Sequence, residues 1–219
     1  MSRKKLFHPE GIPWPFSDIY NLVSLMSVFQ EHYKLVAEEI SLTRKSGTLL
    51  DIGAGPGWLL IAFKRAKNGF SMTGVDISRG MIRRAERNIA RAGYADEIRV
   101  TAGRAHSLPF DDDSFDVIVS TGSIHHWSEP EASMKEIRRV LKKEGEAWIY
   151  DLVKKIPPDI FAEIKKRYGS FRAALLWLHS FEEPFYDIEE FESLVPGSGL
   201  VHVDTHFTGA LCSLHLKKE

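Results

Sequence analysis

The feature that most constrains this sequence is an aliphatic run that leads directly into three alternating glycines. Residues 48–52 read Thr-Leu-Leu-Asp-Ile, and glycines follow at positions 53, 55 and 57. Such a run predicts a buried strand and a tight turn at which another group can approach the backbone closely. A strand-to-helix turn without a ligand is the alternative. Asp76 argues against it, because nucleoside sites place a ribose acceptor after the next apolar run.

Strand-like and helix-like segments alternate along most of the chain. Helices are expected over 19–40, 58–67, 78–92 and 130–143, and strands over 48–52, 70–76, 98–102, 115–120 and 147–152. This alternation predicts an α/β fold: a Rossmann-like, doubly wound, mostly parallel sheet in a three-layer αβα arrangement. Two further strands, 200–207 and 210–216, predict an antiparallel end to a sheet of about seven strands.

The 219 residues are expected to form a single domain. We divide it into an N-terminal arm and helix (1–46), a ligand-binding core (47–152), a helical insertion or cap (153–186) and a C-terminal helix with a strand pair (187–219). The insertion is expected to hold helices over 159–168 and 171–181. Its many aromatic residues suggest a pocket for an apolar molecule, although a stripe of this kind also suits simple helix packing.

Composition excludes several classes of protein. The chain has 29 basic and 30 acidic residues, so its net charge of -1 gives no global attraction to nucleic acid or to an anionic membrane. The single cysteine, Cys212, rules out an intramolecular disulfide framework and a multi-thiolate metal site. We therefore expect a cytoplasmic protein without a metal site, and no apolar stretch approaches the ~20 residues of a membrane-spanning helix.

One local charge pattern leaves an alternative open. Arginines recur every four residues at positions 79, 83, 87 and 91 of one predicted helix. A row of one sign fits binding to RNA, but a solvated outer face is the simpler interpretation given the near-zero net charge. Nucleic acid is thus an unexpected partner that the sequence does not exclude.

Four motifs together resemble the class I S-adenosylmethionine-dependent methyltransferases. They are Leu-Leu-Asp-Ile-Gly-Ala-Gly-Pro-Gly (49–57), Gly-Val-Asp-Ile-Ser (74–78), Leu-Pro-Phe-Asp-Asp-Asp-Ser-Phe-Asp-Val-Ile-Val-Ser (108–120) and Glu-Ile-Arg-Arg-Val-Leu-Lys-Lys-Glu-Gly (136–145). Each motif alone is weakly specific. Their order and spacing over about half of the chain make the combination specific, and the resemblance implies S-adenosyl-L-methionine as cofactor and S-adenosyl-L-homocysteine as product.

The residues of the glycine turn point the same way. A dinucleotide site places its third glycine three residues after the second, whereas here the glycines alternate, and Pro56 removes one backbone donor. Asp51 adds a carboxylate in front of the turn. Acceptors of this kind suit an ammonium and a sulfonium better than phosphates, which favours this cofactor over a nicotinamide.

The resemblance also implies roles for individual residues. The glycine turn would lie against the methionine part of the cofactor, Asp76 would accept hydrogen bonds from the ribose hydroxyls, and Ile77 would face the adenine. The family commonly has an acid after the third strand that accepts from the adenine amino group, whereas this chain has Arg104, which has no acceptor. The full expected set is Asp51, Gly53, Ala54, Gly55, Gly57, Asp76, Ile77, Arg104, Ala105 and Ser120.

His125 and His126 are the candidate catalytic residues, in the loop where the family brings cofactor and acceptor together. In-line methyl transfer needs a general base only if the acceptor must lose a proton, and the ordinary pKa of histidine suits that role near neutral pH. Packing beside Trp127 is the alternative.

We therefore predict a methyltransferase that acts on a small, partly apolar acceptor. A nicotinamide-dependent oxidoreductase on the same fold, and an RNA-directed or non-catalytic cofactor-binding module, are the competing hypotheses.

Overall fold

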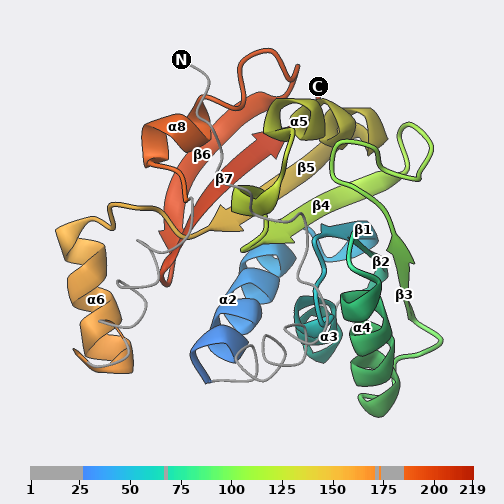
Figure 1. Cartoon of the computed structure of the whole chain (residues 1–219), viewed down its shortest axis with the longest axis horizontal. Coiled ribbons are helices and arrows are strands. Elements are labelled where there is room, and N and C mark those ends of the chain that lie inside the picture. Colours follow the sequence, from blue (N-terminus) through green and yellow to red (C-terminus); the bar gives the residue numbers. More distant parts are fainter. Residues whose placement is uncertain (1–26, 67–68, 171–172, 174–184) are drawn as a thin grey trace.

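A seven-stranded sheet runs through the centre of the molecule (Figure 1). The structure is a computed structural model and describes residues 27–66, 69–170, 173 and 185–219. The strand order is β3-β2-β1-β4-β5-β7-β6. The strands are β1 (Ser46–Ile52), β2 (Gly69–Asp76), β3 (Ile98–Ala102), β4 (Phe115–Thr121), β5 (Leu141–Asp151), β6 (Val201–Thr208) and β7 (Leu211–Lys217).

The first five strands pair in parallel, and β7 runs antiparallel to both of its neighbours. The prediction of a doubly wound, mostly parallel sheet of seven strands with an antiparallel end is confirmed. The chain winds from β1 towards β3 on one side and returns to β4 on the other, so the winding direction changes between β1 and β4. A crevice that suits a ligand opens at the carboxyl ends of the strands at such a point.

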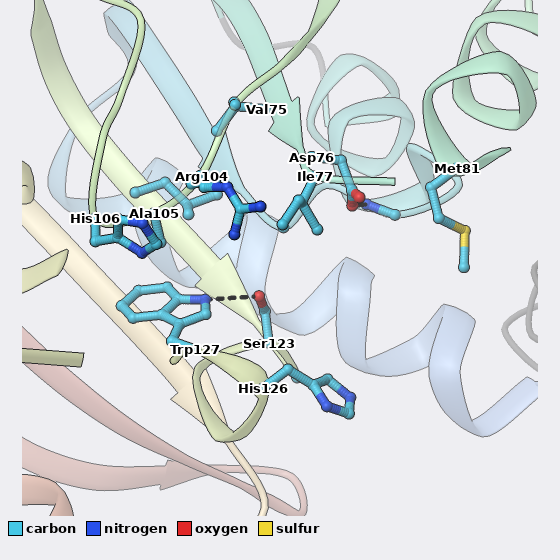
Figure 2. A pocket seen from close by; sticks show the side chains of 15 residues that line it. Val75, Asp76, Ile77, Met81, Arg104, Ala105, His106, Ser123, His126 and Trp127 are labelled. Carbon is cyan, nitrogen blue, oxygen red and sulfur yellow. Dashed lines mark hydrogen bonds between the residues drawn. The ribbon is translucent and has the colours of Figure 1, made fainter. Parts of the chain in front are cut away.

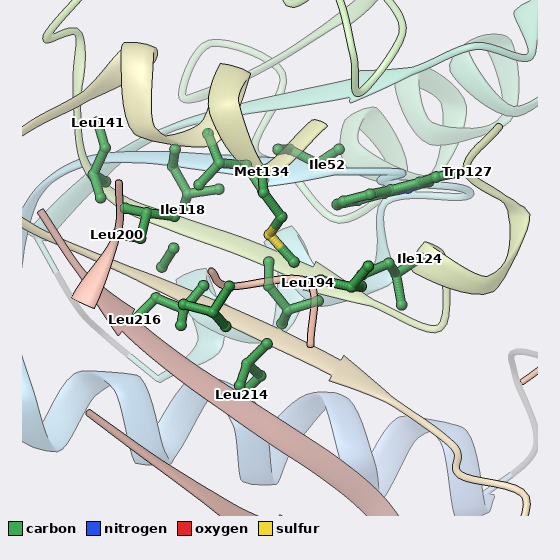
Figure 3. Close-up of a cluster of buried hydrophobic side chains, with 14 of the residues drawn as sticks. Ile52, Ile118, Ile124, Trp127, Met134, Leu141, Leu194, Leu200, Leu214 and Leu216 are labelled. Atoms are coloured by element: carbon green, nitrogen blue, oxygen red, sulfur yellow. The ribbon is translucent and has the colours of Figure 1, made fainter. Parts of the chain in front are cut away.

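Helices cover both faces of the sheet and complete three layers (Figure 1). One face carries α2 (Ser27–Thr43), α3 (Trp58–Arg65) and α4 (Arg79–Arg91), which bury residues such as Ile40, Leu60 and Ile89. The other face carries α5 (Pro130–Val140) and α8 (Ile188–Glu192) over the apolar cluster drawn in Figure 3. The two clusters thus pack against opposite faces of the sheet.

One predicted boundary was wrong. The helix expected over 130–143 ends at Val140, and β5 begins at Leu141 rather than at 147. The strand pairs first through Phe115 with Leu141 and resumes with Val117 opposite Glu146, so the intervening residues form an irregularity. Glu144 adopts a left-handed conformation there (φ 60°), which turns the backbone back towards the sheet.

Glu39 of helix α2 forms hydrogen bonds with strands β5 and β6. The Tyr150 hydroxyl and the Thr208 hydroxyl donate to Glu39 Oε2 over 2.9 and 2.6 Å, and His206 Nε2 contacts Glu39 Oε1. Residues 19–40 were expected to form one helix, and its described part does so from residue 27.

The insertion begins as predicted with a helix, α6 (Pro158–Tyr168). It packs its Ile164 and Tyr168 with Phe185 in a small separate cluster. The second helix expected there, over 171–181, and the arm before residue 27 lie outside the described residues. None of the helices in the described ranges is long and apolar enough to cross a membrane.

Candidate functional site

The glycine turn between β1 and α3 is held by backbone hydrogen bonds to the end of β2. The amides of Gly53 and Ala54 donate to the Val75 carbonyl over 2.8 and 3.1 Å. Gly53 adopts φ 75°, and a Cβ added to it would lie 2.1 Å from Ser123 Oγ. Only glycine fits this position, because both the backbone conformation and the neighbouring loop exclude a side chain.

Asp76 ties this turn to the start of α4. Its Oδ2 accepts from the Gly55 amide and its Oδ1 from the Ser78 amide, each over 2.8 Å. Ser78 caps the helix through its own hydroxyl, as expected. Burial raises the pKa of Asp76, and the two backbone donors act against that rise. Asp76 thus has a structural function that the sequence analysis did not foresee, and its contact with a ribose stays a prediction.

Asp51 is a buried carboxyl group at the end of β1, only 2 % exposed. Its Oδ1 has no hydrogen-bond partner among the residues that the structure describes. Burial, followed by the nearby Asp76 carboxylate, raises the pKa of Asp51 from 3.8 to about 8. A buried acid in this state would be stabilised in its charged form by a cation beside it.

A cavity that is partly open to solvent lies at the carboxyl ends of β1, β2 and β4. The side chains of Asp76, Ile77, Arg104, His126 and Trp127 surround it from separate loops (Figure 2). The lining residues are Ile52, Gly53, Gly55, Val75, Asp76, Ile77, Met81, Gly103, Arg104, Ala105, His106, Gly122, Ser123, His126 and Trp127. The cavity therefore collects most of the residues expected at a cofactor site.

Four of the expected cofactor residues do not line this cavity. Asp51, at the end of β1, and Ala54, within the turn, are buried. Gly57, which precedes α3, lies close to Ala85 of α4. Ser120 is fully buried and donates through its hydroxyl to the Ile52 carbonyl over 2.8 Å. Ser120 thus joins the ends of β4 and β1, and the cofactor contacts expected of these four residues stay predictions.

The two candidate catalytic histidines have different surroundings. His126 lines the cavity, whereas His125 is buried and its Nδ1 lies 2.7 Å from Asp151 Oδ2. The amide of Leu152 donates to Asp151 Oδ1 over 2.8 Å, so backbone and ring together fix this carboxylate. The His125 ring also contacts the rings of His126 and Phe185, with centroids 4.0 and 4.4 Å apart.

Sequence reasoning missed Asp151 and Ser123. Asp151 is the acid at the end of the fifth strand, and its place at a carboxyl end next to a histidine loop was the signal that could have found it. Ser123 accepts a hydrogen bond from the Trp127 indole over 3.0 Å (Figure 2). Its side chain also lies next to Gly53. Nothing in the local sequence marks Ser123, because its partners come from elsewhere in the fold.

These features define an α/β domain with a cavity at the switch point of its sheet. A family model described as a methyltransferase domain matches residues 50–149, which include the glycine turn, Asp76 and both histidines. A solved structure described as that of an S-adenosyl-L-methionine-dependent methyltransferase from Methanococcus maripaludis superposes with a TM-score of 0.74. It is 27% identical, and the match covers 97% of this chain and 96% of that one.

Two curated relatives differ in how much of them is matched. The demethylmenaquinone methyltransferase of Bacillus velezensis is 25% identical over 90% of this chain and 91% of the relative. The uncharacterized methyltransferase YcgJ of Bacillus subtilis is 36% identical over 49% of this chain, which spans only 42% of that protein. Residues 50–149 thus match the methyltransferase family that the motifs resemble. The matches give no support to an oxidoreductase or to an RNA-directed module.

Proposed function

We propose that this protein transfers a methyl group from S-adenosyl-L-methionine to a small, partly apolar acceptor. The observation that carries the proposal is the cavity of Figure 2, where the glycine turn and Asp76 stand opposite the histidine loop. The buried Asp51 carboxyl without a partner on Oδ1 suits a cofactor that brings an ammonium group. The bound cofactor would supply an electrophilic methyl group, and the sulfonium sulfur that carries it would be a good leaving group.

The acceptor is proposed to approach from the side of the insertion. His125 stands between His126, which lines the cavity, and Phe185, which packs with Ile164 and Tyr168 of α6. An apolar, partly aromatic wall of this kind suits a ring-shaped acceptor. A relative that matches most of this chain is named a demethylmenaquinone methyltransferase, so a hydroxylated quinol-type ring is the class of acceptor that we propose.

We further propose His125 as the general base and Asp151 as the residue that positions it. In this role His125 Nδ1 would donate its hydrogen to Asp151 Oδ2, which lies 2.7 Å away, and Nε2 would keep its lone pair. Nε2 could then take the proton that a quinol loses as its carbon or oxygen attacks the methyl group. Asp151 would stabilise the imidazolium that results.

The first experiment is a methyl-transfer assay with labelled cofactor against quinols and against a metabolite extract, together with calorimetry of S-adenosyl-L-homocysteine and NAD. We expect the protein to bind S-adenosyl-L-homocysteine, not to bind NAD, and to transfer the label to a small acceptor. Binding of NAD alone, or label found in RNA or protein alone, would overturn the proposal.

The second experiment compares Asp151→Asn with His125→Gln. General bases typically contribute about 10²-fold or more, so each variant should lower kcat by about that factor while the dissociation constant of S-adenosyl-L-homocysteine stays unchanged. In the unmodified protein kcat should rise with pH as the general base loses its proton, and this limb of the pH profile should be absent in His125→Gln. His126→Gln, next in the chain, is the control that should retain this limb. An unaltered pH profile in His125→Gln would remove His125 from the chemistry.

A further inference from the structure

His32 is a buried histidine at the junction of helix α2, helix α6 and the turn between β6 and β7. It is only 5 % exposed. Its Nε2 accepts a hydrogen bond from the amide of Ala210 in that turn over 2.9 Å. Its ring lies beside the ring of Tyr168 at the end of α6, with centroids 5.5 Å apart. One imidazole therefore joins three elements that are far apart in the sequence (Figure 1).

The turn between β6 and β7 packs closely on this imidazole. Gly209 adopts a left-handed conformation (φ 63°), and a Cβ added to it would lie 2.7 Å from His32 Nε2. Ala210, the next residue, is fully buried, and its amide has the imidazole as its acceptor. A buried amide without an acceptor is unfavourable, so the position of the turn depends on His32.

The same part of α2 contacts the last turn of α6. Arg167 donates through Nε to Glu31 Oε1 over 2.7 Å, and Tyr168 follows with its ring beside His32. The ion pair is exposed, and pairs of this kind contribute little to stability. The contact between Tyr168 and His32 is buried, so it is the one that holds α6 against α2.

These contacts extend to the apolar wall of the proposed acceptor site. Tyr168, Phe185 and Ala210 belong to one buried apolar cluster. The ring of Phe185 contacts the ring of His125, the proposed base, with centroids 4.4 Å apart. His32 thus supports this wall at two points, through Tyr168 and through Ala210.

We propose that His32 is a positioning residue for the acceptor. Through Ala210 and Tyr168 it sets where the apolar wall stands relative to His125, and it does so without contact with the acceptor itself. The inference rests on the proposed function, in which a quinol-type ring lies between this wall and the base. His32 does not line the cofactor cavity, so its loss should affect the acceptor and leave cofactor binding unchanged.

Calorimetry with naphthoquinol, kept reduced under nitrogen, tests this on the protein loaded with S-adenosyl-L-homocysteine. His32→Leu removes the acceptor for the Ala210 amide. It should weaken quinol binding about tenfold, while the dissociation constant of S-adenosyl-L-homocysteine stays unchanged. His32→Gln offers an amide oxygen in place of Nε2 and should restore most of the affinity. If thermal unfolding shows that His32→Leu does not fold, His32→Asn replaces it, because its shorter amide cannot reach Ala210.

Arg139→Met is the control for a general loss of stability. Arg139 donates to Glu136 within α5, away from the wall. Its loss should lower thermal stability and leave quinol binding unchanged. Equal weakening of quinol binding in Arg139→Met would overturn the inference, because the effect would then follow stability alone.

The remaining outcomes separate the inference from the proposed function. Quinol binding by His32→Leu as tight as that of the unmodified protein, or no recovery in His32→Gln, would overturn the inference and leave the proposed function intact. If the unmodified protein binds S-adenosyl-L-homocysteine but no quinol, the proposed class of acceptor fails, and the inference fails with it. If it binds neither compound, the proposed function fails as a whole.

Discussion

The buried carboxyl group of Asp51 should make folding stability depend on pH in a direction opposite to that of most acids. Its pKa is about 8 in the folded protein and 3.8 in the unfolded chain. Between these values the folded state binds more protons than the unfolded state, so stability is highest at low pH and falls as the pH rises towards 8. Proton linkage then gives a destabilisation of about 2 kcal/mol at pH 5 and about 4 kcal/mol at pH 7.

Asp51→Asn removes this titration and keeps the shape of the side chain. In the absence of cofactor, the free energy of unfolding of Asp51→Asn relative to the unmodified protein should therefore rise by about 1.4 kcal/mol per pH unit between pH 5 and 7. Urea unfolding at three pH values in this window measures it.

Asp116→Asn is the control for Asp51→Asn. Asp116 accepts hydrogen bonds from Thr48 and Lys142, which hold its pKa at about 2, below that of the unfolded chain. It is ionised in both states above pH 5, and its effect on stability should not vary in this window. A difference for Asp51→Asn that is equally flat would refute the reasoning.

Three further substitutions probe the site and its supports. Asp76→Ala should weaken binding of S-adenosyl-L-homocysteine by about 1 to 3 kcal/mol, and an unchanged dissociation constant in calorimetry would remove Asp76 from the site. Gly53→Ala should lower the free energy of unfolding by at least about 1 kcal/mol because of its left-handed backbone, and Ser123→Gly should rescue part of the loss by removing the 2.1 Å conflict. Arg139→Met should cost about 1 to 3 kcal/mol in urea unfolding, because Arg139 donates to Glu136 and to the carbonyls of residues 108 and 110; stability equal to that of the unmodified protein would show that these bonds contribute nothing.

The parts of the fold that local chemistry controls were predictable from the sequence. The glycine turn needs left-handed residues wherever it occurs, and alternation of apolar runs with helices leaves few topologies. The prediction therefore placed Asp76 and Arg104 at the carboxyl ends of neighbouring strands, and both line one cavity. The placement of His126 in the loop after β4 succeeded for the same reason.

Features that depend on distant partners were not predictable in this way. The start of β5 follows from the pairing of Leu141 with Phe115, and the local sequence of residues 141–145 reads equally well as a helix end. The proposed role of Asp151 depends on its contact with His125, which lies 26 residues earlier in the chain. A sequence pattern of period two or four carries no information about such contacts.

The position of β7 between β5 and β6 has a consequence for the order of events during synthesis. All five parallel strands and the residues of the cavity precede β7 in the chain, yet β5 acquires its second neighbour only when residues 211–217 have left the ribosome. Until then the backbone of Ile149 and Tyr150, buried in the finished sheet, forms an open edge. An open apolar edge is a site for pairing between nascent chains. The last strand therefore completes a sheet whose cavity residues are already synthesised, and it covers the edge of β5 along which such pairing would occur.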